Sequence, residues 1–203
     1  MTDFSGIHLI TTGEQSIDTL AEIIKDIHPY FRAIHLRERN RSARELLEWI
    51  ERLRVSGCST EQIIVNDRVD VAHYAGLHTV QLASHSIPIQ RMKLLYPSLH
   101  FGCSVHSSEE LTFSILHHAS YVIYGHIFAT NSKQGLSGRG IQALQKLTND
   151  HNLPVIAIGG ITPNLVQSVR KAGAKGIALL SGVLKASDPL ASMKAYVEAW
   201  ETS

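Results

Sequence analysis

The sequence holds residue types that can move protons and bind oxyanions, and they follow short apolar runs. His126 comes directly after the run Tyr121–Gly125 and precedes a loop with two hydroxyls and one cation, Thr130, Ser132 and Lys133. An imidazole titrates near neutral pH, so it can both take and return a proton. A histidine beside an apolar run is more often packed, and 12 histidines dilute the signal. Its place beside this loop nevertheless makes His126 our candidate acid–base residue and the loop a candidate substrate-binding segment.

Two later apolar runs, 154–158 and 176–180, are each followed directly by small residues. Small residues between a strand end and a helix start let backbone N–H groups approach an anion closely. In a (β/α)8 barrel the phosphate site follows the seventh and eighth strands. These runs therefore predict a ligand that carries a phosphate. The candidate phosphate-binding residues are Gly159, Gly160, Leu180, Ser181 and Gly182.

Two arginines mark the end of an earlier run. Strand-like alternation places His35, Arg37 and Arg39 on one face. Two guanidiniums on one face can bind a carboxylate or a phosphate through forked hydrogen bonds. The alternative is a structural salt bridge with Glu38 or Asp67. We take Arg37 and Arg39 as substrate-binding candidates.

Two further runs end in polar residues. Asn66 ends one of them and could orient a ligand; Asp67 beside it could bind a metal, cap a helix or pair with Arg68. In the other, Ser104 and His106 share a face. Ser104 is a binding candidate, whereas His106 suits a helix start or core packing as well as catalysis.

Strand-like and helix-like patterns alternate through the chain, and the elements that must position these residues are eight short apolar runs. The predicted strands are residues 6–11, 33–38, 62–66, 78–82, 100–104, 121–125, 154–158 and 176–180. Ser42 and Ser107 each begin a Ser-x-x-Glu capping box at the start of a predicted helix. Eight such units in about 200 residues favour one (β/α)8 barrel domain over residues 1–203 rather than a doubly wound sheet. The candidate residues then meet at the carboxyl ends of the strands.

The composition is that of an ordinary globular protein, with 203 residues, 44% hydrophobic residues and a net charge of +1. The near-neutral charge argues against nucleic acid or a membrane surface as the main partner. No apolar run approaches the length of a membrane span, and no signal peptide is evident. Cys58 and Cys103 lack zinc-site spacing, so we expect reduced cysteines and a cytoplasmic protein.

Five segments, in order and at matching intervals, resemble the thiamin phosphate synthase superfamily, whose fold is a (β/α)8 barrel. These segments are 35–39, 65–68, 102–107, 130–133 and 157–161. The resemblance covers nearly the whole chain. It implies small phosphorylated substrates and a homodimer.

Three departures from the family pattern point to one of its branches. Arg39 stands where the synthases have lysine, Ser86 where they have a second acidic metal ligand, and Gly125-His126 where they have Gly-Pro. A magnesium–pyrophosphate site that lacks one carboxylate should hold Mg²⁺ poorly. Together these departures resemble the TenI-type thiazole tautomerases.

That branch implies an isomerase that aromatises the exocyclic-alkene tautomer of a small phosphorylated thiazole carboxylate. His126 would move the proton, and Arg37 and Arg39 would face the carboxylate. We expect no metal and no cofactor, and Asp67 would be structural.

Other functions remain open. The first is a thiamin phosphate synthase, a Mg²⁺-dependent transferase that releases pyrophosphate. Asn66, Asp67 and Lys133 favour it, whereas Arg39, Ser86 and His126 count against it. The second is a non-catalytic regulatory or phosphate-sensing barrel, although no basic DNA-binding stripe is present. The third is an isomerase of another small phosphorylated metabolite, because the fold does not identify the reaction.

Overall fold

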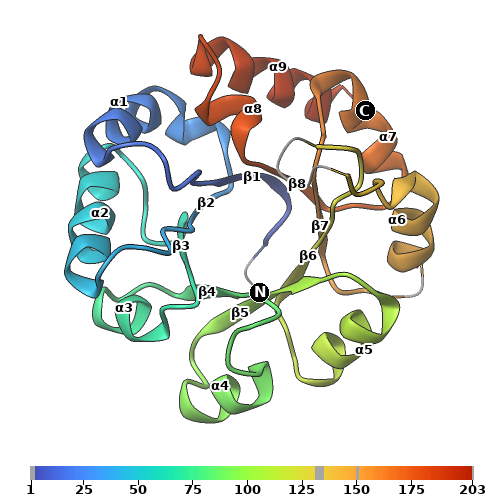
Figure 1. The fold of residues 1–203 in the computed structure, drawn as a ribbon, viewed down its shortest axis with the longest axis horizontal. Coiled ribbons are helices and arrows are strands. Elements are labelled where there is room, and N and C mark those ends of the chain that lie inside the picture. Colours follow the sequence, from blue (N-terminus) through green and yellow to red (C-terminus); the bar gives the residue numbers. More distant parts are fainter. Residues whose placement is uncertain (1–2, 131–134, 150, 203) are drawn as a thin grey trace.

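The computed structural model describes residues 3–130, 135–149 and 151–202. Within these residues eight strands form a closed barrel in chain order, all neighbours are parallel, and β8 pairs with β1 (Figure 1). The strands are β1 Gly6–Ile10, β2 Ala33–Leu36, β3 Ile63–Asn66, β4 Thr79–Leu82, β5 His100–Val105, β6 Tyr121–Gly125, β7 Val155–Ile158 and β8 Gly176–Leu179. The predicted (β/α)8 barrel is confirmed. Strand β2 ends two residues earlier than predicted, which leaves Arg37 and Glu38 in the loop that follows it.

Helices cover the outside of the barrel in Figure 1. They are α1 Ile17–Ile27, α2 Ala43–Val55, α3 Val69–Tyr74, α4 Ile89–Leu95, α5 Ser108–Leu116, α6 Gly140–Asn149, α7 Pro163–Lys171, α8 Ser181–Leu184 and α9 Pro189–Glu201, with the 3-10 turn η1 His28–Tyr30 after α1. No helix in the described part of the chain is long and apolar enough to cross a membrane.

The two predicted capping boxes differ. Ser42 forms a complete one with Glu45, each side chain bonding the other residue's backbone N–H. Ser107 accepts a hydrogen bond from the Glu110 amide at 3.2 Å, but the Glu110 carboxylate turns to the amide of His106 at 2.6 Å. That bond orders the chain just after β5. His106 therefore belongs to a helix start, one of the three roles that the sequence left open.

The strands alternate between two cores, because successive side chains point to opposite faces. Outward side chains pack under the helices in one large apolar cluster. Apolar side chains that fill the inside of the barrel are Phe4, Ile10, Ala33, Ile64, Tyr121, Ile123, Ile156 and Ala178. Burying each larger side chain contributes about 1.5–3 kcal/mol before the entropy cost of ordering is counted. The barrel is therefore a filled support for the loops at its carboxyl end.

Candidate active site

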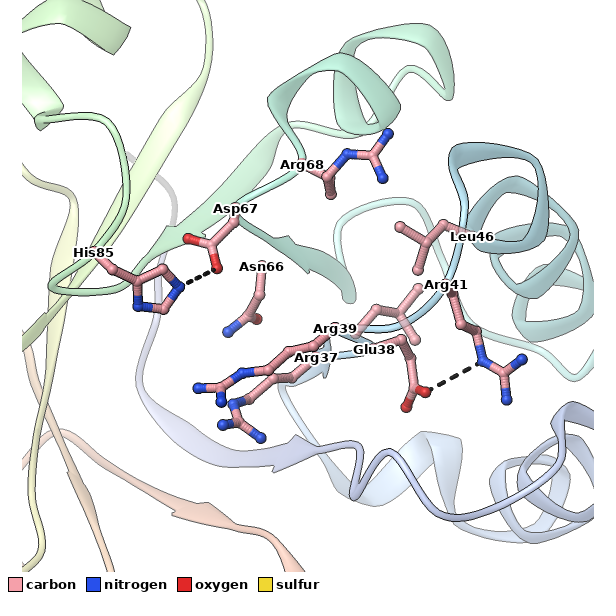
Figure 2. Close-up of a pocket in the computed structure, with 10 residues that line it drawn as sticks. Arg37, Glu38, Arg39, Arg41, Leu46, Asn66, Asp67, Arg68 and His85 are labelled. Atoms are coloured by element: carbon pink, nitrogen blue, oxygen red, sulfur yellow. Dashed lines mark hydrogen bonds and ion pairs between the residues drawn. The ribbon is translucent and has the colours of Figure 1, made fainter.

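A pocket of about 270 Å³ opens at the carboxyl ends of β2 and β3, beside the loop after β4 (Figure 2). Its lining residues are Leu36, Arg37, Glu38, Arg39, Arg41, Leu46, Asn66, Asp67, Arg68 and His85. The backbone N–H of Arg37 donates to the hydroxyl of Thr11 at 3.0 Å, which ties the end of β2 to the loop after β1. The catalytic end of a (β/α)8 barrel is the end where this pocket lies.

Arg37 and Arg39 supply unpaired positive charge to this pocket. Figure 2 shows their side chains extending in the same direction. Neither guanidinium forms an ion pair with a carboxylate of the described residues. Burial lowers the pKa of Arg37 from its usual value, and the positive charge of Arg39 lowers this pKa further. An anion bound between the two arginines would relieve this repulsion.

The salt bridge proposed as an alternative from the sequence does not form. Glu38 is buried and pairs with Arg41 at 3.3 Å, and Arg41 also lies 3.3 Å from Glu45. Asp67 faces His85, with Nε2 of His85 3.4 Å from Oδ2 of Asp67. Both pairs are drawn in Figure 2. The carboxylates nearest to the two arginines are thus held by other partners.

Asp67 also organises the turn after β4. Its backbone has a φ of 63°, a left-handed conformation that Asp tolerates better than most residues, and its N–H donates to the Gln81 carbonyl at 3.0 Å. The Ser86 hydroxyl donates to Oδ1 of Asp67, and the amide of Ala83 donates to Oγ of Ser86 at 2.6 Å. The aspartate therefore joins the end of β3 to residues 83–86.

Of two further predicted binding residues, Asn66 lies in the arginine pocket and Ser104 lies outside it. Asn66 lines the pocket, and its Oδ1 is buried without a hydrogen-bond partner in the described ranges. Ser104 accepts a hydrogen bond from Nε2 of Gln81 at 3.1 Å and lines a separate cavity of about 440 Å³ bordered by α4 and α5. The structure therefore does not bring Ser104 into the arginine pocket.

His126 packs beside β7. It is 8% exposed, the Gly125–His126 peptide is cis, and Nε2 lies 3.3 Å from the Leu136 carbonyl oxygen. A Cβ added to Gly159 would lie 2.3 Å from Cβ of His126. Nδ1 is buried and has no hydrogen-bond partner among the residues described. His126 does not line the arginine pocket. The predicted loop residues Ser132 and Lys133 lie outside the described residues, and Thr130 is the last one before them.

The predicted phosphate-binding segments lie side by side, because Ile158 pairs with Ala178 in the sheet. Gly159 and Gly160 have φ values of 103° and 64°, which favour glycine. A Cβ on Gly160 would lie 2.4 Å from the Ala129 carbonyl oxygen, and one on Gly182 would lie 2.6 Å from the Tyr196 hydroxyl. Gly160 therefore also allows close packing of its loop against the segment after β6, and Gly182 allows close packing of α8 against α9; the sequence indicated neither role.

The arginine pocket and the glycine segments face each other across the barrel mouth. β3 and β7 are four strands apart in a closed ring of eight, and Figure 1 shows them on opposite sides. Two regions suited to anions thus flank the same opening.

A model of the family described as thiamine monophosphate synthase matches residues 7–183. The chain belongs to this family. A thiamine-phosphate synthase from Anaeromyxobacter dehalogenans is 33% identical over 198 residues, which cover 97% of this chain and 88% of that protein. The one from Pyrococcus furiosus is 36% identical over 157 residues, or 77% and 76% of the two chains. A solved thiamine phosphate pyrophosphorylase from Pyrococcus furiosus superposes with a TM-score of 0.83 at 28% identity, covering 98% of this chain and 97% of that one.

The similarity to these thiamine monophosphate synthases corrects one prediction. We interpreted Arg39, Ser86 and His126 as marks of a tautomerase, an isomerase. That prediction is wrong, because relatives that are 28–36% identical over most of the chain are named thiamine-phosphate synthases. Three substitutions within motifs are a narrower signal than similarity along the whole barrel. The proton transfer assigned to His126 in that isomerisation is withdrawn with it, whereas the acid–base role predicted from its position stays a prediction.

The family resemblance also implies a magnesium site, and the residues present do not fit one. Mg²⁺ prefers carboxylate and water oxygens in octahedral geometry. Here the second acidic position is Ser86, and its hydroxyl already donates to the remaining carboxylate, Asp67. In the described ranges no group of three or more His, Cys, Asp or Glu side chains could hold a metal ion.

Proposed function

We propose that this protein is a thiamin phosphate synthase, a transferase that joins a pyrimidine pyrophosphate to a thiazole phosphate and releases pyrophosphate. Two lines of support lead to this proposal. The relatives that are similar to this chain over most of its length are named thiamine-phosphate synthases. The barrel mouth has two regions suited to anions, and the two substrates of this reaction are both phosphorylated.

One observation carries the proposal: Arg37 and Arg39 have no carboxylate partner in the described part of the chain, although they lie at the catalytic end of the barrel. Breaking the bond between carbon and pyrophosphate leaves the bonding electron pair on the departing oxygen. Preorganised cations that face this oxygen stabilise the charge as it develops. We assign the pyrophosphate end of the first substrate to this pair.

The remaining candidates take supporting roles in this proposal. The phosphate of the thiazole would bind to backbone N–H groups across the mouth, in the segments that contain Gly159, Gly160, Leu180, Ser181 and Gly182. Asn66, beside the arginines, would orient the first substrate through its side-chain amide. Thr130 lies in the segment after β6, one residue beyond Ala129, which packs against Gly160, so Thr130 would contact the second substrate.

The test is a direct assay of pyrophosphate release from the pyrimidine pyrophosphate in the presence of thiazole phosphate. Arg37→Gln should lower kcat/KM by about 10²–10³-fold, the usual cost of removing one charge-stabilising donor. Arg44→Gln is the matched control, because Arg44 is exposed on α2 and does not line the pocket. No pyrophosphate release by the wild type, or full activity of Arg37→Gln, would contradict the proposal.

A further inference from the structure

Each carboxylate oxygen of Asp67, the acidic residue in the synthase-like motif at the end of β3, lies beside a residue of the turn after β4. Oδ1 accepts from the Ser86 hydroxyl and, at 3.5 Å, from the amide of Ala83. Oδ2 lies 3.4 Å from Nε2 of His85. A metal ion that bound this carboxylate would have to displace contacts that hold residues 83–86 against β3.

The other two arginines of the pocket, Arg41 and Arg68, are already paired with carboxylates. Arg68 is held by Asp70, with two hydrogen bonds of 2.9 and 2.6 Å. Arg41 is held by Glu38 and lies 4.3 Å from the Trp49 ring centroid. Among the described arginines that line the pocket, Arg37 and Arg39 are therefore those not held by a carboxylate.

Two guanidiniums can do for a pyrophosphate what a divalent cation does. Each presents a fork of N–H donors that matches a pair of phosphate oxygens, and each keeps its charge across the working pH range. Mg²⁺ instead needs several oxygen ligands in a strict geometry. The pocket supplies the first kind of group and does not supply the second.

We propose that this pocket binds the pyrophosphate group through Arg37 and Arg39 without a divalent cation, and that Asp67 holds the turn 83–86 instead of ligating a metal. The inference rests on the proposed function for the identity of the anion. It goes beyond that function in making pyrophosphate binding independent of metal.

The experiment is calorimetric titration of the intact protein with inorganic pyrophosphate, once with excess Mg²⁺ and once with EDTA. The Kd in EDTA should be equal to or lower than the Kd with Mg²⁺, because Mg²⁺ competes for free pyrophosphate in solution. A Kd at least about tenfold higher in EDTA would overturn the inference. The double variant Arg37→Gln/Arg39→Gln should weaken binding at least about tenfold in both buffers, and unchanged binding by this variant would also overturn it.

A variant at Ser86 tests the metal question by gain of function. Ser86→Asp places a second carboxylate against Asp67, so pyrophosphate binding should become at least about tenfold weaker in EDTA and recover with Mg²⁺. Ser84→Asp is the matched control, because Ser84 is exposed in the same turn; its binding should stay insensitive to Mg²⁺. Binding by Ser86→Asp that stays as tight in EDTA as in the wild type would count against the inference.

Asp67→Asn separates a turn-holding residue from a metal ligand. Asparagine tolerates the left-handed backbone and still accepts the Ser86 hydrogen bond, so binding should stay within about threefold of the wild type or become tighter. A loss of more than about tenfold that appears only with Mg²⁺ would identify Asp67 as a ligand and refute the inference.

These titrations use no turnover, so the two proposals fail separately. Metal-dependent binding in a protein that releases pyrophosphate would refute this inference and leave the function standing. Metal-independent binding in a protein that releases no pyrophosphate would support this inference and refute the proposed function.

Discussion

Nδ1 of His8 lies 2.9 Å from Nε2 of His35 inside the closed barrel. Nε2 of His8 lies 2.9 Å from the Phe4 carbonyl oxygen, which can only accept, so this nitrogen carries the proton of the neutral ring. Nδ1 of His8 is then an acceptor, and Nε2–H of His35 donates to it. Nδ1 of His35 is left as a buried acceptor without a partner in the described part of the chain. The contact between the rings allows at most one of them to be charged, and burial away from water favours the state in which both are neutral.

This pair predicts a loss of stability in acid. Burial lowers the pKa of His8 from 6.5 to about 4, and burial, followed by the charge of His8, lowers the pKa of His35 well below 6.5. Below pH 6.5 the unfolded chain binds more protons than the folded one, so the free energy of unfolding should fall as the pH drops from about 6.5 towards 4. His8 alone accounts for a loss of about 3 kcal/mol.

Urea unfolding between pH 4 and pH 8 measures this loss. His8→Leu should flatten the dependence, because one of the two groups no longer titrates. His78→Gln is the control, since His78 is exposed, and it should keep the wild-type slope. The same slope in His8→Leu and in the wild type would show that other groups cause the acid sensitivity.

Gly159→Ala should destabilise the fold for two separate reasons. A Cβ there meets Cβ of His126 at 2.3 Å, and the φ of 103° disfavours any side chain. We expect a loss of about 3 kcal/mol in the free energy of unfolding, measured in urea.

Gly76→Ala isolates the backbone part of this effect. Its φ is 66°, and an added Cβ there meets nothing within 4 Å. The expected loss is about 1 kcal/mol. Equal losses at both glycines would show that the contact with His126 relaxes without cost.

Arg37 and Arg39 should differ in their tolerance of lysine. Arg37 is half-buried and Arg39 is exposed. Lysine keeps the charge but loses the planar fork, so Arg37→Lys should raise the KM for the pyrimidine pyrophosphate by about tenfold or more, and Arg39→Lys by about threefold or less. Steady-state kinetics of pyrophosphate release measure both values. A larger effect at Arg39 than at Arg37 would reverse this assignment of the main anion contact.

Much of the barrel follows from local pattern. Each strand is a short apolar run, and caps such as Ser42 mark helix starts through contacts only three residues long. The eight predicted strands therefore match the observed ones to within one or two residues at each end. The sequence also pointed to Arg37 and Arg39 as a pair, but β2 ends at Leu36, so the loop after β2 and not strand alternation brings both arginines into one pocket.

The class of reaction could not be predicted from the single positions Arg39, Ser86 and His126. His126 follows an apolar run, but its Nε2 lies 3.3 Å from the Leu136 carbonyl oxygen, and its Cα and Cβ pack against Gly159. No sequence signal indicated these contacts. The wider similarity of the chain to the synthases decided against the isomerase.

By itself, the sequence determined the alternation of strands and helices, the family and the arginine pair, because each depends on residues close together in the chain or on similarity along all of it. Only the tertiary structure decided which charges stay unpaired. Ser86 lies 19 residues from Asp67 and reaches its carboxylate because β3 and β4 are neighbours in the barrel. The tertiary structure also decided that Ser104 lies outside the arginine pocket, because β5 places it at another cavity. Such pairings depend on how the closed sheet brings distant loops together, and no local pattern encodes that distance.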